Sequence, residues 1–136
     1  MAYTPQHGKL TVLKVGANDI SPSTKTSNFS GSADVHDSSG YGVTNRTKAG
    51  GIADGTFTAS GSYDIQATIG TPTLLEGKEG TTFALTRQVA GAGTGKPQEV
   101  FSAVLAKFDV SAPFDDMVTW SGEWSVSGVV NRTAQP

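Results

Sequence analysis

The stretch that decides the fold runs from Gln98 to Asn131 and reads QEVFSAVLAKFDVSAPFDDMVTWSGEWSVSGVVN. It predicts two long strands joined by the turn Ala-Pro-Phe-Asp-Asp at residues 112–116. We expect the second strand to run from Met117 to Val130, where apolar and polar residues alternate almost without exception. Because side chains alternate across a strand, the pattern predicts one core face and one small, polar, weakly acidic face.

Two strands divide in this way. In the second strand of the hairpin, the expected core face carries Val118, Trp120, Gly122, Trp124, Val126, Gly128 and Val130, and the polar face carries Thr119, Ser121, Glu123, Ser125 and Ser127. In a shorter strand, Thr56 to Tyr63, the core face carries Phe57, Ala59, Gly61 and Tyr63, and the polar face carries Thr56, Thr58, Ser60 and Ser62. These polar faces are either functional surfaces or the plain solvent-facing side of a sheet.

The first strand of the hairpin, Gln98 to Val110, is apolar on both faces. Phe101, Ala103 and Leu105 alternate with Val100, Val104, Ala106 and Phe108. An antiparallel strand with one solvated face does not have this composition. We therefore expect both faces to be covered, by the chain's own fold or by a neighbouring subunit, which makes Phe101, Val104 and Leu105 candidate interface residues.

The rest of the chain predicts a single domain over residues 1–136 with an N-terminal arm (1–8), a long glycine-rich loop (36–51) and a C-terminal tail (131–136). Further strands are expected at 8–15, 28–35 and 81–88, turns at 16–19 and at Asp54-Gly55, and irregular chain at 21–27. Thr71, Pro72 and Gly77 indicate one short helix. The fold class is mainly β, a β-sandwich or flattened barrel with one short α-helix. Tyr41, Arg46 and Lys48, in the long loop, are further interface candidates.

The composition excludes several classes of protein. The chain has no cysteine, which rules out disulfides and thiolate metal sites, and its net charge is −2, which argues against gripping nucleic acid through its phosphates. No stretch approaches the roughly 20 apolar residues of a membrane span, and we expect no signal peptide. Only 16% of residues are charged, while there are 14 serines and 17 threonines. An ordinary β-sandwich and a subunit covered by copies of itself both fit this surface.

The motifs that could carry chemistry have simpler interpretations. The run AGAGTGKP at 90–97 resembles a phosphate-binding loop, but Ala90 replaces the first glycine and Pro97 replaces the hydroxyl residue. Asp115 and Asp116 are adjacent and typical of a turn, and His36-Asp37 has no accompanying nucleophile motif. Two histidines make a metal site improbable. We therefore predict no enzyme activity, no cofactor and no metal.

Two glycosylation sequons and a pair of tryptophans also have simpler interpretations. Asn45 and Asn131 each begin a glycosylation sequon, which we interpret as coincidence without a secretion signal. Trp120 and Trp124 share a face and could stack a ligand, although core packing is the default for tryptophans flanked by valines.

The segment Phe108 to Val130 resembles the C-terminal hairpin of tail tube proteins from phages with long, non-contractile tails. In that family a strand ends in a turn like S-A-P-x-D-D and restarts as an aromatic-rich strand ending in S-G-x-V. Ser32 to Asp64 is also similar to the family, with an acidic strand end, a Ser/Thr-Gly-rich loop, Gly-hydrophobic-x-Asp-Gly, and a strand ending in Gly-x-Tyr-Asp. The two segments cover roughly two-fifths of the chain. Residues Ile65 to Gly80 depart from the family, being short and containing Pro72.

The resemblance implies a structural virion protein that forms hexameric rings, stacked into the tail tube through which the genome passes. It implies that one sheet lines the lumen and that the N-terminal arm and the long loop bridge to adjacent rings. The implied partners are further copies, double-stranded DNA passing without specific binding, and other tail proteins (tape measure, terminator and tip). The implied location is the virion tail, assembled in the host cytoplasm.

The polar faces agree with this function. A conduit should not bind phosphate through basic side chains or stack bases on aromatics, and hydroxyls with carboxylates avoid both. We therefore expect these residues to face the lumen, with Glu123 the main acidic candidate. The alternatives are a plain solvent face, a capsid decoration protein of β-sandwich type, and a carbohydrate-binding sandwich that exposes Trp120, Trp124 or Tyr41.

Overall fold

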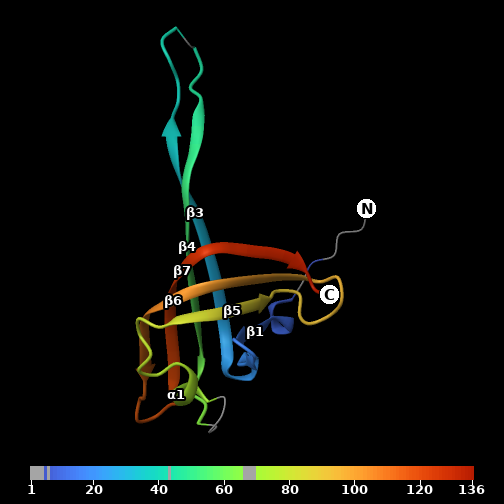
Figure 1. Ribbon diagram of the computed structural model, residues 1–136. Coiled ribbons are helices and arrows are strands. Elements are labelled where there is room, and N and C mark those ends of the chain that lie inside the picture. Colours follow the sequence, from blue (N-terminus) through green and yellow to red (C-terminus); the bar gives the residue numbers. More distant parts are fainter. Residues whose placement is uncertain (1–4, 6, 43, 66–69) are drawn as a thin grey trace.

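The computed structural model describes residue 5 and residues 7–42, 44–65 and 70–136. Within these ranges the chain forms one seven-stranded antiparallel sheet in the order β2-β1-β5-β6-β7-β4-β3 (Figure 1). The strands are β1 (Val12–Val15), β2 (Asn18–Asp19), β3 (Thr24–Asp37), β4 (Lys48–Ser62), β5 (Thr82–Gln88), β6 (Pro97–Ser111) and β7 (Thr119–Ala134). Short helical segments lie at Gly8–Leu10, Ser21–Ser23 and α1 (Thr71–Leu74). The fold is mainly β, as the sequence predicted.

The sheet folds over on itself, so that its two ends face each other across the core. Three strand spacings of about 4.8 Å separate β3 from β6 in a flat sheet, or roughly 14 Å. Yet the rings of Phe29 in β3 and Phe101 in β6 lie 5.3 Å apart, edge to face. Arg87 in β5 donates a hydrogen bond to the Ser27 carbonyl of β3 at 3.4 Å. Figure 1 shows how this is achieved, because β6 and β7 both change direction sharply along their length.

The bends coincide with irregularities in the pairing of β6 with β7. Leu105 pairs with Trp124 and Lys107 pairs with Glu123, which leaves Ala106 as an extra residue in β6. A bulge of this kind bends the strand and re-aims the side chains that follow it. A second shift separates the Ser102–Ser127 pair from Val100–Asn131, where Gly128 has φ of +84°. Each long strand therefore serves both halves of the folded sheet.

The bulge at Ala106 corrects one sequence prediction. Strict alternation placed Phe108 on the opposite face from Leu105. In the structure Phe108 pairs with Gly122 and stacks on Trp120 with ring centroids 6.1 Å apart, on the core side. The second face of β6 is accordingly less apolar than predicted, with Val100 and Val104 half-buried and Ala106 exposed.

The core lies between the two halves. Its fully buried aromatics are Phe57, Trp120 and Trp124, and it takes Leu13, Val15, Leu85, Phe101, Ala103 and Leu105 from the opposing half. Phe57 touches both sides, at 5.4 Å from Phe101 and 5.6 Å from Trp124 between ring centroids. The core faces predicted for Thr56–Tyr63 and for the second hairpin strand are therefore confirmed from Phe57 to Gly61 and from Trp120 to Trp124.

The long loop predicted at 36–51 is mostly a β-hairpin. β3 continues to Asp37 and β4 begins at Lys48, so only residues 38–47 connect them. Figure 1 shows this hairpin projecting well beyond the body of the molecule. Two related expectations were wrong: 24–27 belongs to β3 rather than to irregular chain, and Asp54-Gly55 lies inside β4 rather than in a turn. The turn preference of Asp54 and Gly55 does not decide the local structure, because continuous pairing with β3 satisfies their backbone groups.

The chain ends differ in part from the prediction. The C-terminal tail at 131–136 is instead the end of β7, and Gln135 beyond it is buried. The N-terminal arm (1–8) falls largely outside the described residues, and Gly8 already begins a 3-10 helix. The predicted first strand, 8–15, shortens to β1, while the short helix at Thr71 is confirmed, with Gly77 at φ +75° beyond it.

Gly61 offers a test of how closely β4 packs against the chain that leads into β3. A Cβ at Gly61 would lie 1.8 Å from the Ser23 carbonyl oxygen, which also accepts a hydrogen bond from the Trp120 indole. We expect Gly61→Ala to lower the free energy of unfolding by about 2 kcal/mol or more, because backbone must move. The measurement is urea unfolding of dilute protein followed by tryptophan fluorescence.

The matched control is Gly50→Ala in the same strand, where a Cβ would meet nothing within 4 Å. Its stability should change by less than about 0.5 kcal/mol. Equal effects of the two substitutions would contradict the close approach of β4 to Ser23.

Candidate functional site: the hydroxyl face and the projecting hairpin

The two polar faces predicted from separate parts of the chain form one surface. β4 and β7 are neighbours, and their register pairs Thr56 with Ser125, Thr58 with Glu123, Ser60 with Ser121 and Ser62 with Thr119. We call this surface, with Ser127, the hydroxyl face. Its β7 members are exposed and its β4 members are half-buried. Strand pairing thus brings together two polar faces that lie about sixty residues apart in the sequence.

The hydroxyl face continues onto the strands on either side. On β3 it gains Asn28 and Ser30, opposite Thr58 and Thr56, and Thr26, whose hydroxyl hydrogen-bonds that of Ser60. On β6 it gains Ser102, Lys107, Asp109 and Ser111. The result is a surface four strands wide. None of the positions named here carries an aromatic side chain.

The charge of the hydroxyl face is slightly negative. Glu123 and Asp109 carry carboxylates, and Lys107 is the basic residue among the positions named above. Lys107 lies opposite Glu123 in the register, but its ammonium pairs with Asp109 at 3.5 Å. The pair is exposed on both sides, so it contributes little to stability. Glu123 thus presents its negative charge to whatever lies against this surface.

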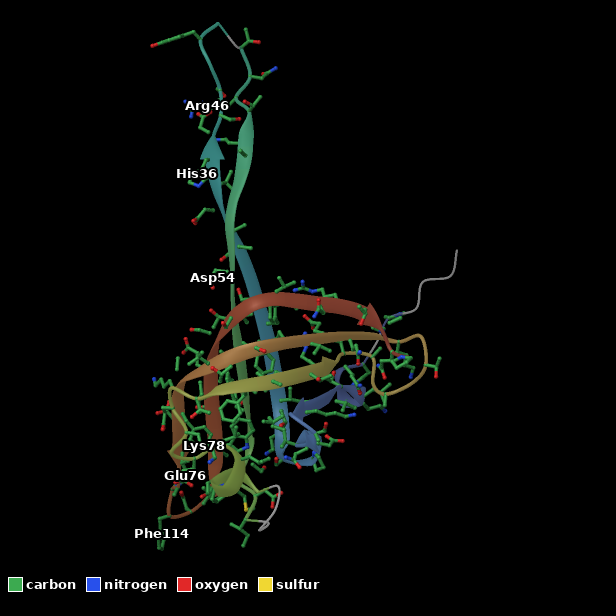
Figure 2. The ribbon with its side chains drawn as sticks, viewed as in Figure 1. His36, Arg46, Asp54, Glu76, Lys78 and Phe114 are labelled. Atoms are coloured by element: carbon green, nitrogen blue, oxygen red, sulfur yellow. The ribbon has the colours of Figure 1, made fainter. Side chains whose placement is uncertain are left out.

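The interface candidates on the hairpin are well placed for contact with another molecule. Tyr41 is fully exposed in the 38–47 connection, and Arg46 and Lys48 are exposed beside it. Figure 2 shows Arg46 and His36 far out on the projecting hairpin. The connection is held by hydrogen bonds from Ser38 N to Thr47 O at 2.9 Å and from Thr47 N to the Ser39 hydroxyl at 2.7 Å. Arg46 lies 3.8 Å from the Asp37 carboxylate.

The apolar interface candidates on β6 are placed differently. Phe101 and Leu105 have 3% and 0% of their surface exposed and pack in the chain's own core. They are therefore unavailable to a neighbouring subunit, because the folded-over sheet already covers them. Val104 lies on the opposite face, half-buried, beside Ser125.

Several motifs weighed for chemistry have structural roles. The glycine-rich run at 90–97 uses its backbone to hold Gln135: Gly93 N donates to the Gln135 amide oxygen at 3.0 Å, and the Gln135 amide donates to Gly91 O at 2.9 Å. Trp120 and Trp124 are buried and form no exposed platform. Within the described part of the chain, no three His, Asp or Glu side chains cluster as metal ligands. No helix in the described ranges has the length and apolar content that crossing a bilayer requires.

An ionic cluster at the junction of the two halves was missed by sequence reasoning. Glu99 in β6 lies 3.2 Å from Arg87 in β5 and 3.6 Å from Arg132 in β7. The Arg132 guanidinium also lies 5.2 Å from the Phe29 ring centre, a cation–π contact that reaches β3. The available signal was a carboxylate directly before the apolar run that begins at Val100, since a carboxylate needs a partner when it is partly buried.

No family model matches the sequence, and no curated protein matches it. Solved structures of tails do match the fold. The tail of the empty gene transfer agent particle, solved with C6 symmetry, has a TM-score of 0.76 over 96% of this chain and 100% of that chain, at 13% identity. The SPP1 tail tube has a TM-score of 0.76 over 96% of this chain and 80% of that chain, at 11% identity.

This chain has the tail tube fold. A third match is the sheath–tube complex of an extracellular contractile injection system, with a TM-score of 0.64 over 96% of this chain and 93% of that chain, at 14% identity. The tail tube fold is therefore shared by contractile and other tail assemblies. The resemblance read from the sequence is confirmed at the level of fold.

The hairpin gives a pH-dependent prediction. The Ser39 backbone N–H donates to Asp37 at 2.9 Å, and this bond, followed by one from the Ser39 hydroxyl, holds the pKa of Asp37 below its ordinary value. The turn should therefore be ordered at neutral pH and loosen as the pH falls through the lowered pKa. We expect Ser39→Ala to raise the pKa of Asp37 toward, but not fully to, its ordinary value, since the backbone bond remains. Carboxyl-carbon NMR titration measures this shift, and an unchanged pKa would contradict it.

Proposed function

We propose that this chain is a structural virion protein whose copies assemble as hexameric rings, stacked into a tail tube through which the genome passes. The hydroxyl face lines the lumen. In this proposal the chain catalyses no reaction, needs no cofactor and works in the virion tail with other tail proteins. The observation that carries the proposal is a surface mainly of hydroxyls and carboxylates across β3, β4, β7 and β6, interrupted on β6 by Val104 and Lys107, in a chain with the tail tube fold.

The physical demands of a conduit support the lumen assignment. DNA slides only if the wall neither neutralises its phosphates nor stacks its bases. The hydroxyl face is low in both features, because Lys107 is already paired with Asp109 and the nearby aromatics point into the core. Lys25, which lines a hollow with Ser60 and Ser121, is a further basic side chain at its border. Serine and threonine keep the wall hydrated without adding charge.

The free edge of the sheet supports assembly. β3 is 14 residues long and ends the strand order, so its outer edge has no partner within the described chain. A long unpaired edge is a template for uncontrolled association unless a neighbour covers it. Closing a ring would cover the same edge in every copy, since a head-to-tail contact repeats until the ring closes.

The direct test of assembly is electron microscopy of the purified protein over a range of concentrations. We expect tubes of stacked rings with an open central channel. Isolated monomers or trimers at every concentration, with binding to capsid shells, would contradict the proposal and favour a decoration protein.

The lumen assignment is tested by Glu123→Lys. The substitution replaces the acidic wall charge with a basic one in every copy, so passing phosphates are attracted and genome release should slow at least about threefold. Tubes should still assemble, because Glu123 is exposed and forms no ion pair within the described residues. Release is followed by the fluorescence of a DNA-binding dye outside particles that carry the variant.

The matched control is Glu79→Lys, the same charge change at an exposed position before β5 and outside the hydroxyl face. It should leave the release rate unchanged. If both variants release DNA at the wild-type rate, the hydroxyl face does not line the path of the genome.

A further inference from the structure

An apolar groove lies at the base of the projecting hairpin. It encloses about 720 Å³, and its lining includes Phe29, Gly55, Val126, Val129 and Arg132. At Gly55 the Phe29 ring and Val126 already pack closely, since a Cβ there would lie 3.2 Å from the ring and 3.3 Å from Val126. Val129, in the groove lining, is 79% exposed. The groove therefore offers unfilled apolar area where β7 bends away from the hairpin.

An exposed apolar side chain lies away from the groove, in the turn between β6 and β7. Phe114 is fully exposed in the turn between β6 and β7, and Met117 beside it is 71% exposed. Figure 2 shows Phe114 at the lower end of the molecule and Asp54, which also lines the groove, near the place where the projecting hairpin leaves the body. Pro113 and a hydrogen bond from Met117 N to the Asp116 carboxylate at 2.7 Å stiffen the turn. Phe114 is thus presented on a short, preordered loop.

We propose that Phe114 of one copy inserts into the groove at the hairpin base of the next copy. This inference rests on the proposed function, because it specifies how one ring would stack on another. The occupant is a second copy of this chain rather than a different protein, since the chain itself supplies both the unfilled groove and, on a different surface, the unburied aromatic. Burying a phenylalanine removes a large apolar area from water, and the contact is repeated in every subunit of the ring.

Charge favours the same pairing. Asp115 and Asp116 follow Phe114, and neither forms an ion pair within the described chain. Arg132 lines the groove with 58% of its side chain exposed, and its only ion pair in the described chain is to Glu99, at 3.6 Å from Nε. Its remaining guanidinium donors are free to meet a carboxylate. Asp54 also lines the groove and would repel the carboxylates of Asp115 and Asp116. The acidic turn is therefore directed to the Arg132 side.

The geometry makes this contact axial. The groove lies along the middle of β4 and the second half of β7, whereas the Phe114 turn precedes the start of β7. The contact therefore joins unlike surfaces and can repeat without limit along one direction. The hairpin projects past the groove (Figure 1), and in such a stack it would lie alongside the copy whose Phe114 occupies that groove. A contact within one ring would instead need the groove of one copy and the Phe114 turn of its neighbour to lie at the same level along the tube axis.

Disulfide trapping tests the contact in the full chain, which has no native cysteine. We expect Phe114→Cys with Val129→Cys to give, on oxidation of assembled protein, a ladder of multiples of 14.0 kDa on a non-reducing gel. Each single variant should give dimers at most. The control is Phe114→Cys with Leu10→Cys, whose second position is also exposed, and it should give no ladder.

A second measurement separates the apolar contact from mere proximity. Phe114→Ser should raise the protein concentration needed for assembly at least about tenfold, by loss of the buried ring. Phe114→Leu, which keeps an apolar side chain at the same exposed site, should assemble close to the wild-type concentration. Urea unfolding of dilute protein should be unchanged in both, since Phe114 makes no core contact.

The outcomes distinguish this inference from the proposed function. Tubes that form with no ladder from the Phe114–Val129 pair, or with full tolerance of Phe114→Ser, overturn the groove contact and leave the tail tube proposal standing. Wild-type protein that never forms tubes overturns the proposed function and the groove contact with it. A ladder in the Leu10 control equal to that of the test pair also overturns the specific contact.

Discussion

The structure depends on the doubling over of one sheet, held by aromatic side chains that meet between its two halves. Phe29 of β3, Phe101 of β6, Phe57 of β4 and Trp124 of β7 form, in that order, an unbroken chain of ring contacts with centroids between 5.3 and 5.6 Å apart. Rings of this size bury large areas, and edge-to-face geometry adds to that burial. The bulges in β6 and β7 are what permit the approach, since unbulged strands of fifteen or sixteen residues would continue away from each other.

Doubling over decides which surfaces remain for other molecules. Every large apolar residue of the inner faces is used by the core, so the outer face of β3, β4, β7 and β6 can consist of hydroxyls without loss of stability. The ionic cluster of Glu99, Arg87 and Arg132 lies at the seam between the halves, and its Arg132 also covers Phe29. The same residue that closes the fold thus lies at the rim of the groove where another copy is proposed to dock.

Much of the fold and of the candidate site was predictable because a strand has a period of two. The alternation in Thr119–Ser127 and in Thr56–Ser62 identified the hydroxyl face residue by residue, and the core face opposite it. The error at Phe108 came from the same rule, because one extra residue at Ala106 reverses the alternation beyond it. The glycine-rich stretch at 36–51 and the Asp54-Gly55 pair were misjudged for a related reason: glycine and turn residues are accepted in a strand when a partner strand satisfies their backbone.

The sequence by itself determined the fold class, the two-faced strands and the absence of thiol chemistry, since these follow from composition and local periodicity. Only the tertiary structure decided which polar faces join into one surface, that Phe101 and Leu105 are core rather than interface, and that Arg132 and Glu99 meet. Those facts depend on strand order, register and bulges. Such features arise from contacts between residues far apart in the chain, and no local pattern encodes the distance between them.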